Sequence, residues 1–310
     1  MCYNKGNNGH GRYGKEFTMT DVKFSGIYTA LLTPFDQNGK INENALIDHI
    51  HQNIAAGATG FYVNGSTAES FLLTEAERKY IYELVAAEAK GKCTLLAQIG
   101  AISTDQAIEY AKLCEKLGYD AISSVAPFYY KFGANEIKNY YFDIVNEVSL
   151  PMIVYHIPAF SGVALGAAAF EAFLTDDRFA GVKYTANDYF LMEQLKTAFP
   201  NKVIYNGYDE TFLAGLSMGA DGGIGSTYNC MVDKYVKIEK LFREGKIAEA
   251  QEIQRQVNFI INIFIKHGVM AAEKEVLNQK GLAFGDCRRP FAPISEEGKR
   301  EIAERVMPLL

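Results

Sequence analysis

Eight short apolar segments, rich in β-branched and aromatic residues, alternate with stretches of helical periodicity from Gly26 onward. This alternation is typical of parallel strands joined by crossover helices. Eight such units close most naturally into a barrel, so the sequence predicts an α/β fold, a TIM (β/α)8 barrel with additional C-terminal helices. The expected strands are residues 26–35, 60–65, 93–100, 121–128, 152–158, 179–185, 203–207 and 222–227.

Helix boundaries in the sequence support this prediction. Two segments, Thr74-Glu-Ala-Glu77 and Ser103-Thr-Asp-Gln106, have the pattern of a capping box. In that arrangement the first side chain accepts a hydrogen bond from a backbone amide and the fourth side chain reciprocates. Gly57 and Gly118 stand where helix C-caps are expected.

The chain is expected to have three parts. Residues 1–23 are rich in Gly, Asn and Lys and lack the hydrophobic stretch of a secretory signal, so we expect a disordered extension or a tag. Residues 24–230 are expected to supply the barrel strands and most barrel helices, and residues 231–310 the final barrel helix and a C-terminal helical appendage. Helical stretches begin near Val232, Ile247 and Ser295, with a Gly/Pro-rich break at residues 285–293.

Composition excludes several classes of protein. The 310 residues are 48% hydrophobic and 22% charged, which is ordinary for a globular protein, and no apolar run is long enough to span a bilayer. A net charge of −6 lacks the basic footprint of a nucleic-acid-binding protein. The five cysteines include no Cys-x-x-Cys pair, which argues against a disulfide framework and favours a reducing cytoplasm.

Neither a metal site nor a dinucleotide site is expected. His49 and His51 are two positions apart and so do not share a helical face, which disfavours a zinc pair. The glycine run Gly222–Gly225 lacks the spacing of the dinucleotide-binding fingerprint.

The strongest candidate for chemistry is Lys183, a single lysine inside the apolar segment 179–185. Burial favours the uncharged amine, which can attack a ketone and form a Schiff base. Alternatively, Lys183 is a strand-end lysine that extends its amine to solvent. Tyr155 ends the apolar segment 152–158 and is either a proton carrier beside Lys183 or a core tyrosine with a satisfied hydroxyl. Both residues fall at strand C-terminal ends, where barrel active sites lie.

Two polar loops follow other expected strands. In Gly65-Ser-Thr-Ala-Glu69, hydroxyls and backbone amides could hold a carboxylate, or the segment could be a turn that caps the following structure. The segments Asn206–Glu210 and Gly222–Tyr228 combine acids, glycines and hydroxyls, a composition suited to polyhydroxyl ligands. The alternative is that the acids are helix N-terminal residues and the glycines a phosphate-binding turn or a packing device.

These motifs resemble those of the pyruvate-dependent class I aldolases grouped with dihydrodipicolinate synthase and N-acetylneuraminate lyase. The resemblance covers essentially everything after Phe24. Within the group, Phe160 stands where the synthases usually have an arginine, which leaves no guanidinium for a second substrate carboxylate and favours the lyase branch. The matching motifs are Gly65–Glu69, Pro127–Tyr129, Tyr155–Pro158, Gly181–Lys183, Gly207–Glu210 and Asp221–Asn229.

The chain departs from the usual family residues at Ala68, His156 and Tyr184, which bears on fine substrate preference. None of these departures touches the expected nucleophile, the proton-transfer tyrosine or the carboxylate-binding hydroxyls.

The resemblance implies an enzyme that reversibly cleaves N-acetylneuraminate to pyruvate and N-acetylmannosamine. Lys183 would form a covalent Schiff base with the substrate, with no cofactor. Tyr155 would exchange a proton with the C4 hydroxyl, and Ser66 and Thr67 would hold the pyruvyl carboxylate. Tyr129 would be lent by a neighbouring subunit, which implies a homotetramer. The sugar portion would contact Thr185, Gly207, Asp209, Glu210 and Ser226.

Two alternatives remain open from the sequence. One is another pyruvate-dependent reaction on the same scaffold, such as dihydrodipicolinate synthesis or cleavage of a different 2-oxo acid. The other is a non-catalytic protein that binds sugar acids.

Overall fold

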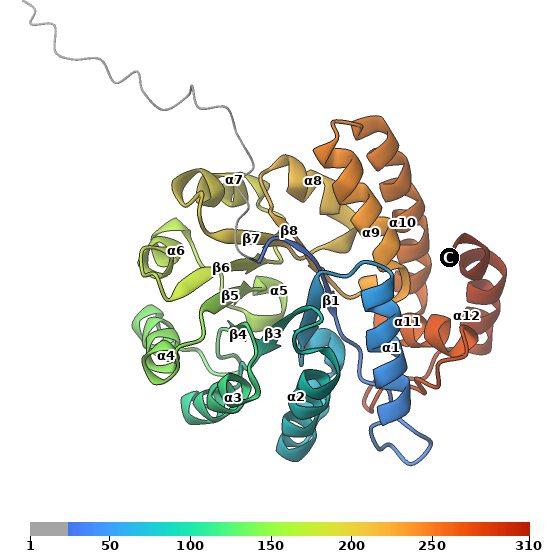
Figure 1. The fold of residues 1–310 in the computed structure, drawn as a ribbon, viewed down its shortest axis with the longest axis horizontal. Coiled ribbons are helices and arrows are strands. Elements are labelled where there is room, and N and C mark those ends of the chain that lie inside the picture. Colours follow the sequence, from blue (N-terminus) through green and yellow to red (C-terminus); the bar gives the residue numbers. More distant parts are fainter. Residues whose placement is uncertain (1–23) are drawn as a thin grey trace, which may run out of the picture.

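The computed structural model describes residues 24–310, so the expected extension at residues 1–23 lies outside the described residues. Eight parallel strands follow one another around a closed barrel, and β1 pairs with both β2 and β8 (Figure 1). The predicted TIM (β/α)8 barrel is therefore confirmed. The strands are β1 (Gly26–Ala30), β2 (Gly60–Val63), β3 (Thr94–Gln98), β4 (Ala121–Val125), β5 (Met152–His156), β6 (Phe179–Tyr184), β7 (Val203–Asn206) and β8 (Gly222–Gly225).

The strands are almost wholly buried because both of their faces are covered. One set of side chains fills the barrel interior, including the rings of Tyr28, Tyr62 and Tyr205. The outward set packs against the surrounding helices in a separate core. Burial on both faces explains why the strands read in the sequence as nearly continuous apolar runs.

Each observed strand ends earlier than predicted. The first ends at residue 30 instead of 35, and the fourth at residue 125 instead of 128. Beyond these points the chain leaves the hydrogen-bonded ladder and forms loops at the C-terminal face of the barrel. Apolar loop residues such as Leu31, Leu32 and Phe128 continue the strand pattern and extended some of the predicted strands too far.

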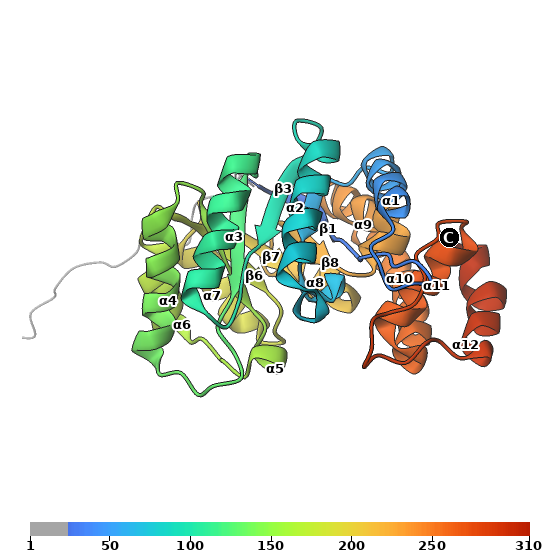
Figure 2. The same cartoon turned by 90° about the horizontal axis from the view of Figure 1, so that it is seen from below.

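Helices surround the barrel, as Figures 1 and 2 show. The predicted capping box is present at α2, where Thr74 accepts from the Glu77 amide and the Glu77 side chain accepts from Thr74. Helices in this part are α1 (Glu43–Ala55), η1 (Ser66–Ala68), η2 (Ser70–Leu72), α2 (Glu75–Ala89), α3 (Thr104–Leu117), α4 (Ala134–Glu147), α5 (Pro158–Ser161), α6 (Ala167–Leu174), α7 (Tyr189–Ala198), η3 (Asp209–Thr211), α8 (Phe212–Ser217) and α9 (Tyr228–Arg243).

The capping box predicted at Ser103 is wrong. Ser103 occupies the N-cap position of α3, but its side chain makes no capping hydrogen bond. The residue is exposed, so water can satisfy the first amides of this helix. The two glycines predicted at helix C-termini lie there. Gly118 is the C-cap of α3, with a φ of 82°, and Gly57 directly follows the C-cap of α1, with a φ of 97°.

The C-terminal helices pack beside the barrel next to α9 and form a second large core with it (orange and red in Figures 1 and 2). A separate helix beginning at Val269 was not predicted, because Gly268, with φ 88° and ψ 111°, interrupts a long helical pattern. Residues 285–293 contain neither helix nor strand, as their Gly/Pro content predicted. The elements are α10 (Ile247–His267), α11 (Val269–Gln279), α12 (Glu296–Glu301), η4 (Ile302–Val306) and η5 (Met307–Leu309).

None of the helices in residues 24–310 is both long enough and apolar enough to cross a membrane. The division into a barrel at 24–230 and an appendage at 231–310 stays a proposal.

Candidate active site

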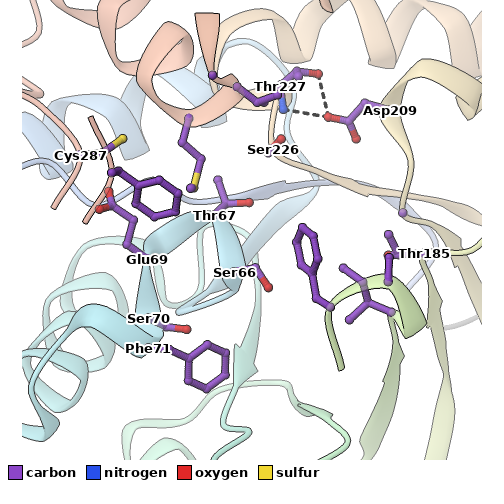
Figure 3. A pocket seen from close by; sticks show the side chains of 18 of the residues that line it. Ser66, Thr67, Glu69, Ser70, Phe71, Thr185, Asp209, Ser226, Thr227 and Cys287 are labelled. Carbon is purple, nitrogen blue, oxygen red and sulfur yellow. Dashed lines mark hydrogen bonds between the residues drawn. The ribbon is translucent and has the colours of Figure 1, made fainter. Parts of the chain in front are cut away.

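One cavity of about 820 Å³ opens at the C-terminal ends of the strands (Figure 3). It collects residues that are far apart in the sequence, because the strand ends of a closed parallel barrel converge on one face. All of the predicted site residues except Tyr129 line this cavity. They are Ser66, Thr67, Tyr155, Lys183, Thr185, Gly207, Asp209, Glu210 and Ser226.

Lys183 lies near the C-terminal end of β6 and is 5% exposed. Its neighbours in register are Tyr155 on β5 and Tyr205 on β7. The amine contacts aromatic faces: Nζ lies 4.1 Å from the centroid of the Tyr155 ring and 4.2 Å from that of Tyr62. Within residues 24–310 it forms no ion pair, and the Asp209 carboxylate acts on it only through space.

This environment makes Lys183 a good nucleophile. Desolvation lowers the pKa of the amine to about 7, although the Asp209 charge opposes that shift. A substantial fraction of Lys183 is therefore neutral near pH 7, with a free electron pair for attack on a carbonyl carbon. The solvent-extended lysine considered from the sequence is excluded by this burial.

Tyr155 lies beside Lys183 and is 4% exposed. Burial raises the pKa of its phenol to about 12, while the hydroxyls of Ser66 and Thr185 act in the opposite direction. The phenol is consequently protonated at neutral pH. It can move protons only by receiving one as it releases another, which requires neighbouring hydroxyls or substrate groups. Ser66 and Thr185, whose hydroxyls act on the Tyr155 pKa, are the neighbouring hydroxyls that could take part.

Ser66 and Thr67 belong to the short helix η1, which follows β2 after Gly65. Gly65 packs against the Tyr62 ring so closely that a Cβ there would lie 2.9 Å from ring atoms. Both hydroxyl residues line the cavity (Figure 3). Hydroxyls and the first amides of a helical turn are suitable donors for a carboxylate.

Thr185 and Gly207 lie next to each other at the ends of β6 and β7. The Thr185 Oγ1 is buried and has no hydrogen-bond partner among residues 24–310. A Cβ at position 207 would lie 1.9 Å from that oxygen, so only glycine permits this approach. The arrangement leaves the Thr185 hydroxyl available to a ligand.

Asp209 is held in place by Thr227. One carboxylate oxygen, Oδ2, accepts hydrogen bonds from the Thr227 amide at 2.8 Å and from its hydroxyl at 2.7 Å (Figure 3). The other oxygen, Oδ1, is buried without a partner in the described part of the chain. Burial raises the pKa of Asp209 to about 6, and Lys183 acts to lower it. Oδ1 is thus positioned to accept a hydrogen bond from a ligand hydroxyl.

Glu210 is exposed at the rim, and Ser226 lies deeper, just after β8. The backbone of the Glu210 segment is tied to α10, because the Asn258 side chain donates to the Glu210 carbonyl at 2.9 Å. Both residues line the cavity and add a carboxyl group and a hydroxyl to its polar groups.

Tyr129 lies apart from this cavity. Its side chain is 84% exposed, its φ is 78°, and its ring packs edge-on against Tyr130 with the centroids 5.1 Å apart. An exposed tyrosine in a left-handed backbone conformation is uncommon. Its predicted role, lent to a neighbouring subunit, stays a prediction.

Sequence reasoning missed some of the cavity. Thr227 anchors Asp209, and its place directly after Ser226 was the available signal. Two C-terminal segments, 267–271 and 290–293, also line the cavity, as does Cys287. Nothing in their local patterns indicates that they reach the barrel mouth, because this depends on how α10 and α11 pack.

The described residues contain no group of three or more His, Cys, Asp or Glu side chains arranged to hold a metal ion. His49, one of the two histidines considered from the sequence, is buried and hydrogen-bonds to Asn229 at 2.9 Å.

Comparison with known proteins identifies the family. The model of the dihydrodipicolinate synthetase family matches residues 23–308. The chain belongs to this family. Within the dihydrodipicolinate synthetase family, the N-acetylneuraminate lyase of Citrobacter koseri is 44% identical over 274 residues, which cover 88% of this chain and 92% of that protein.

Solved structures agree with the family assignment. CdNal from Clostridium difficile in complex with mannosamine has a TM-score of 0.89 and 40% identity, over 91% of this chain and 97% of that chain. The N-acetylneuraminate lyase of Fusobacterium nucleatum complexed with pyruvate has a TM-score of 0.87 and 38% identity, over 92% and 97% of the two chains.

Proposed function

We propose that this protein is a Schiff-base aldolase that reversibly cleaves N-acetylneuraminate to pyruvate and N-acetylmannosamine. The observation that carries the proposal is the buried amine of Lys183, which lies against Tyr155 in the cavity that also presents Ser66 and Thr67. The similar N-acetylneuraminate lyases, at 44% identity and over most of both chains, support this choice of substrate.

Catalysis begins with the neutral Lys183 amine. Nζ attacks the ketone carbon of the open-chain sugar acid, and loss of water gives a protonated imine. The imine accepts the electron pair of the C3–C4 bond as that bond breaks, which gives an enamine of pyruvate and the aldehyde of N-acetylmannosamine. Protonation of the enamine carbon and hydrolysis of the imine release pyruvate and restore Lys183.

The proton on the C4 hydroxyl must leave as the bond breaks. Tyr155 is the group that receives it in cleavage and returns it in synthesis. Because its phenol is protonated at neutral pH, Tyr155 must pass its own proton onward at the same time. The Ser66 and Thr185 hydroxyls and the substrate carboxylate are available for that transfer.

Ser66 and Thr67 hold the pyruvyl carboxylate, and the opposite wall binds the sugar hydroxyls. Asp209 offers Oδ1 and Thr185 offers its hydroxyl, neither of which has a hydrogen-bond partner among the described residues. Such groups discriminate between hydroxyl patterns, because the wrong sugar leaves a buried polar atom without a hydrogen bond. Gly207, Glu210 and Ser226 complete the sugar-binding wall.

Tyr129 is exposed in the single chain, and we propose that it reaches the hydroxyl relay of a neighbouring subunit in a homotetramer. The chemistry requires no cofactor, since the imine supplies the electron sink. We place the protein in the cytoplasm because Cys93, Cys114, Cys230 and Cys287 are free thiols.

The test is steady-state release of pyruvate from a panel of N-acetylneuraminate and other 2-oxo acids. We expect pyruvate and N-acetylmannosamine in equal amounts from N-acetylneuraminate. Release from a different 2-oxo acid alone would assign another aldolase reaction to the same site. Binding of sugar acids without any turnover would instead indicate a non-catalytic protein.

A further inference from the structure

A buried ion pair joins the loop that carries Ser66 and Thr67 to the C-terminal helices. The Nζ of Lys274, on α11, donates to Oε1 of Glu69 at 2.6 Å. The two side chains are 1% and 0% exposed, respectively. These residues are 205 positions apart, and Glu69 directly follows η1.

Glu69 is the point at which the loop turns. It adopts a left-handed backbone conformation, with a φ of 57°, between η1 and η2. Its amide donates to the Ser66 carbonyl at 3.0 Å, and its own carbonyl accepts from the Leu72 amide at 2.8 Å. A residue other than glycine keeps this conformation only where its surroundings fix it.

Both carboxylate oxygens of Glu69 are used for this purpose. Oε1 accepts from Lys274, and Oε2 accepts from the backbone amide of Arg288 at 2.5 Å. Lys274 also donates to the Asp286 carbonyl at 3.2 Å. The direction of the Glu69 side chain is therefore set by two different parts of the C-terminal region.

Arg288 holds the far end of the same loop. Its guanidinium donates to the Leu72 carbonyl at 3.2 Å and forms a two-point ion pair with Glu77 at 2.6 and 2.7 Å. The Arg288 Cζ and the Lys274 Nζ each lie 4.4 Å from the centroid of the Phe35 ring. The segment 66–72 is thus fastened at its middle and at its end.

We propose that Glu69 and Lys274 are positioning residues that hold Ser66 and Thr67 in the geometry that binds the carboxylate of the keto acid. The C-terminal helices thereby set the affinity of the site for pyruvate. A buried ion pair contributes little net stability relative to apolar residues of the same shape, but it fixes a direction that apolar residues would not. This inference rests on the proposed function.

The test measures the pyruvate concentration that gives half of the maximal borohydride-trapped adduct on Lys183. In Lys274→Met, which keeps the length of the side chain but removes its charge, we expect this concentration to rise by about tenfold or more, since small misplacements of binding groups are costly. The amount of adduct at saturating pyruvate should stay at the wild-type level, because the Lys183 environment is unchanged.

Lys196→Met is the matched control. Lys196 also forms a buried ion pair, with Asp221 at 2.7 Å, but Asp221 directly precedes β8 and so lies at the opposite end of the barrel. In this control we expect the half-saturating pyruvate concentration to stay within about twofold of wild type, because the segment 66–72 is not disturbed.

Arg288→Ala provides a second variant that should fold even if Lys274→Met does not, because the Arg288 side chain is 22% exposed. Loss of its contacts with Leu72 and Glu77 should raise the half-saturating pyruvate concentration by roughly threefold. Circular dichroism verifies the fold of each variant.

A folded Lys274→Met or Arg288→Ala protein with the half-saturation of wild type would overturn the inference, as would an equal rise in Lys196→Met. If the wild-type protein formed no adduct at any pyruvate concentration, the proposed function would fail and this inference with it.

Discussion

Lys183 and Lys196 are both buried, but the two regions around them differ in chemistry. At the base of the barrel, Lys196 donates to both oxygens of Asp221 and to the carbonyls of Pro200 and Lys202. At the mouth, the amine of Lys183 lies against aromatic rings, and no carboxylate makes contact with it within residues 24–310.

The difference shows how one fold uses the same side chain in two ways. The Lys196 side chain, with four acceptors, joins α7 to the chain that enters β7 and β8. Burial without such acceptors lowers the pKa of the Lys183 amine to about 7, so a larger fraction is neutral and able to act as a nucleophile. Burial alone therefore does not single out a candidate nucleophile; the groups that contact the amine within residues 24–310 must be compared as well.

The largest effect that tests this comparison is expected from Lys183→Ala. Loss of the nucleophile should abolish the pyruvate adduct and lower the turnover of N-acetylneuraminate by on the order of 10⁴-fold or more. Borohydride trapping followed by mass spectrometry, together with a pyruvate assay, provides the measurement. As the control, Lys196→Ala should give a less stable protein that still forms the adduct. An adduct that persists in Lys183→Ala would contradict the assignment of Lys183 as the nucleophile.

A smaller effect is expected from Tyr155→Phe. The ring that lies against Lys183 is retained and only the hydroxyl is lost, so imine formation should continue while cleavage slows by roughly 10²-fold or more. Trapped adduct and steady-state turnover are measured on the same preparation. Unchanged turnover would remove Tyr155 from proton transfer.

The smallest effect concerns pH. Because the Lys183 pKa is about 7, the rate of adduct formation should rise as pH increases through 7 and become constant above it, where the amine is neutral. The Asp209 charge raises this pKa, so Asp209→Asn should lower it and move the rise to lower pH. Trapping with cyanoborohydride at pH 6 should then be about twofold to fivefold faster than in wild type. A profile that moves to higher pH would contradict the through-space effect of Asp209.

Much of the fold was predictable from the sequence, because each parallel strand is buried on both faces and each is followed by a helical pattern. The ends of the strands were less predictable, since apolar loop residues such as Phe128 continue the pattern beyond Val125, where the ladder ends. The helix that begins at Val269 was missed because a single glycine, Gly268, divides two helices of similar periodicity.

The candidate site was predictable where strand ends carry it. Lys183, Tyr155 and the Ser66–Thr67 pair lie in one cavity because the barrel brings those ends together. The fastening of Glu69 by Lys274 could not be predicted in this way. It joins residues 205 positions apart through the packing of α11, and local patterns contain no information about that packing.

The connection between Glu69 and Lys274 also bears on biosynthesis. A nascent polypeptide that has already emerged with all eight strands still lacks the partners that hold segment 66–72, because Lys274 and Arg288 are translated later. The contacts that hold segment 66–72 thus form only after Lys274 and Arg288 have been synthesised, which is later than the synthesis of the barrel strands.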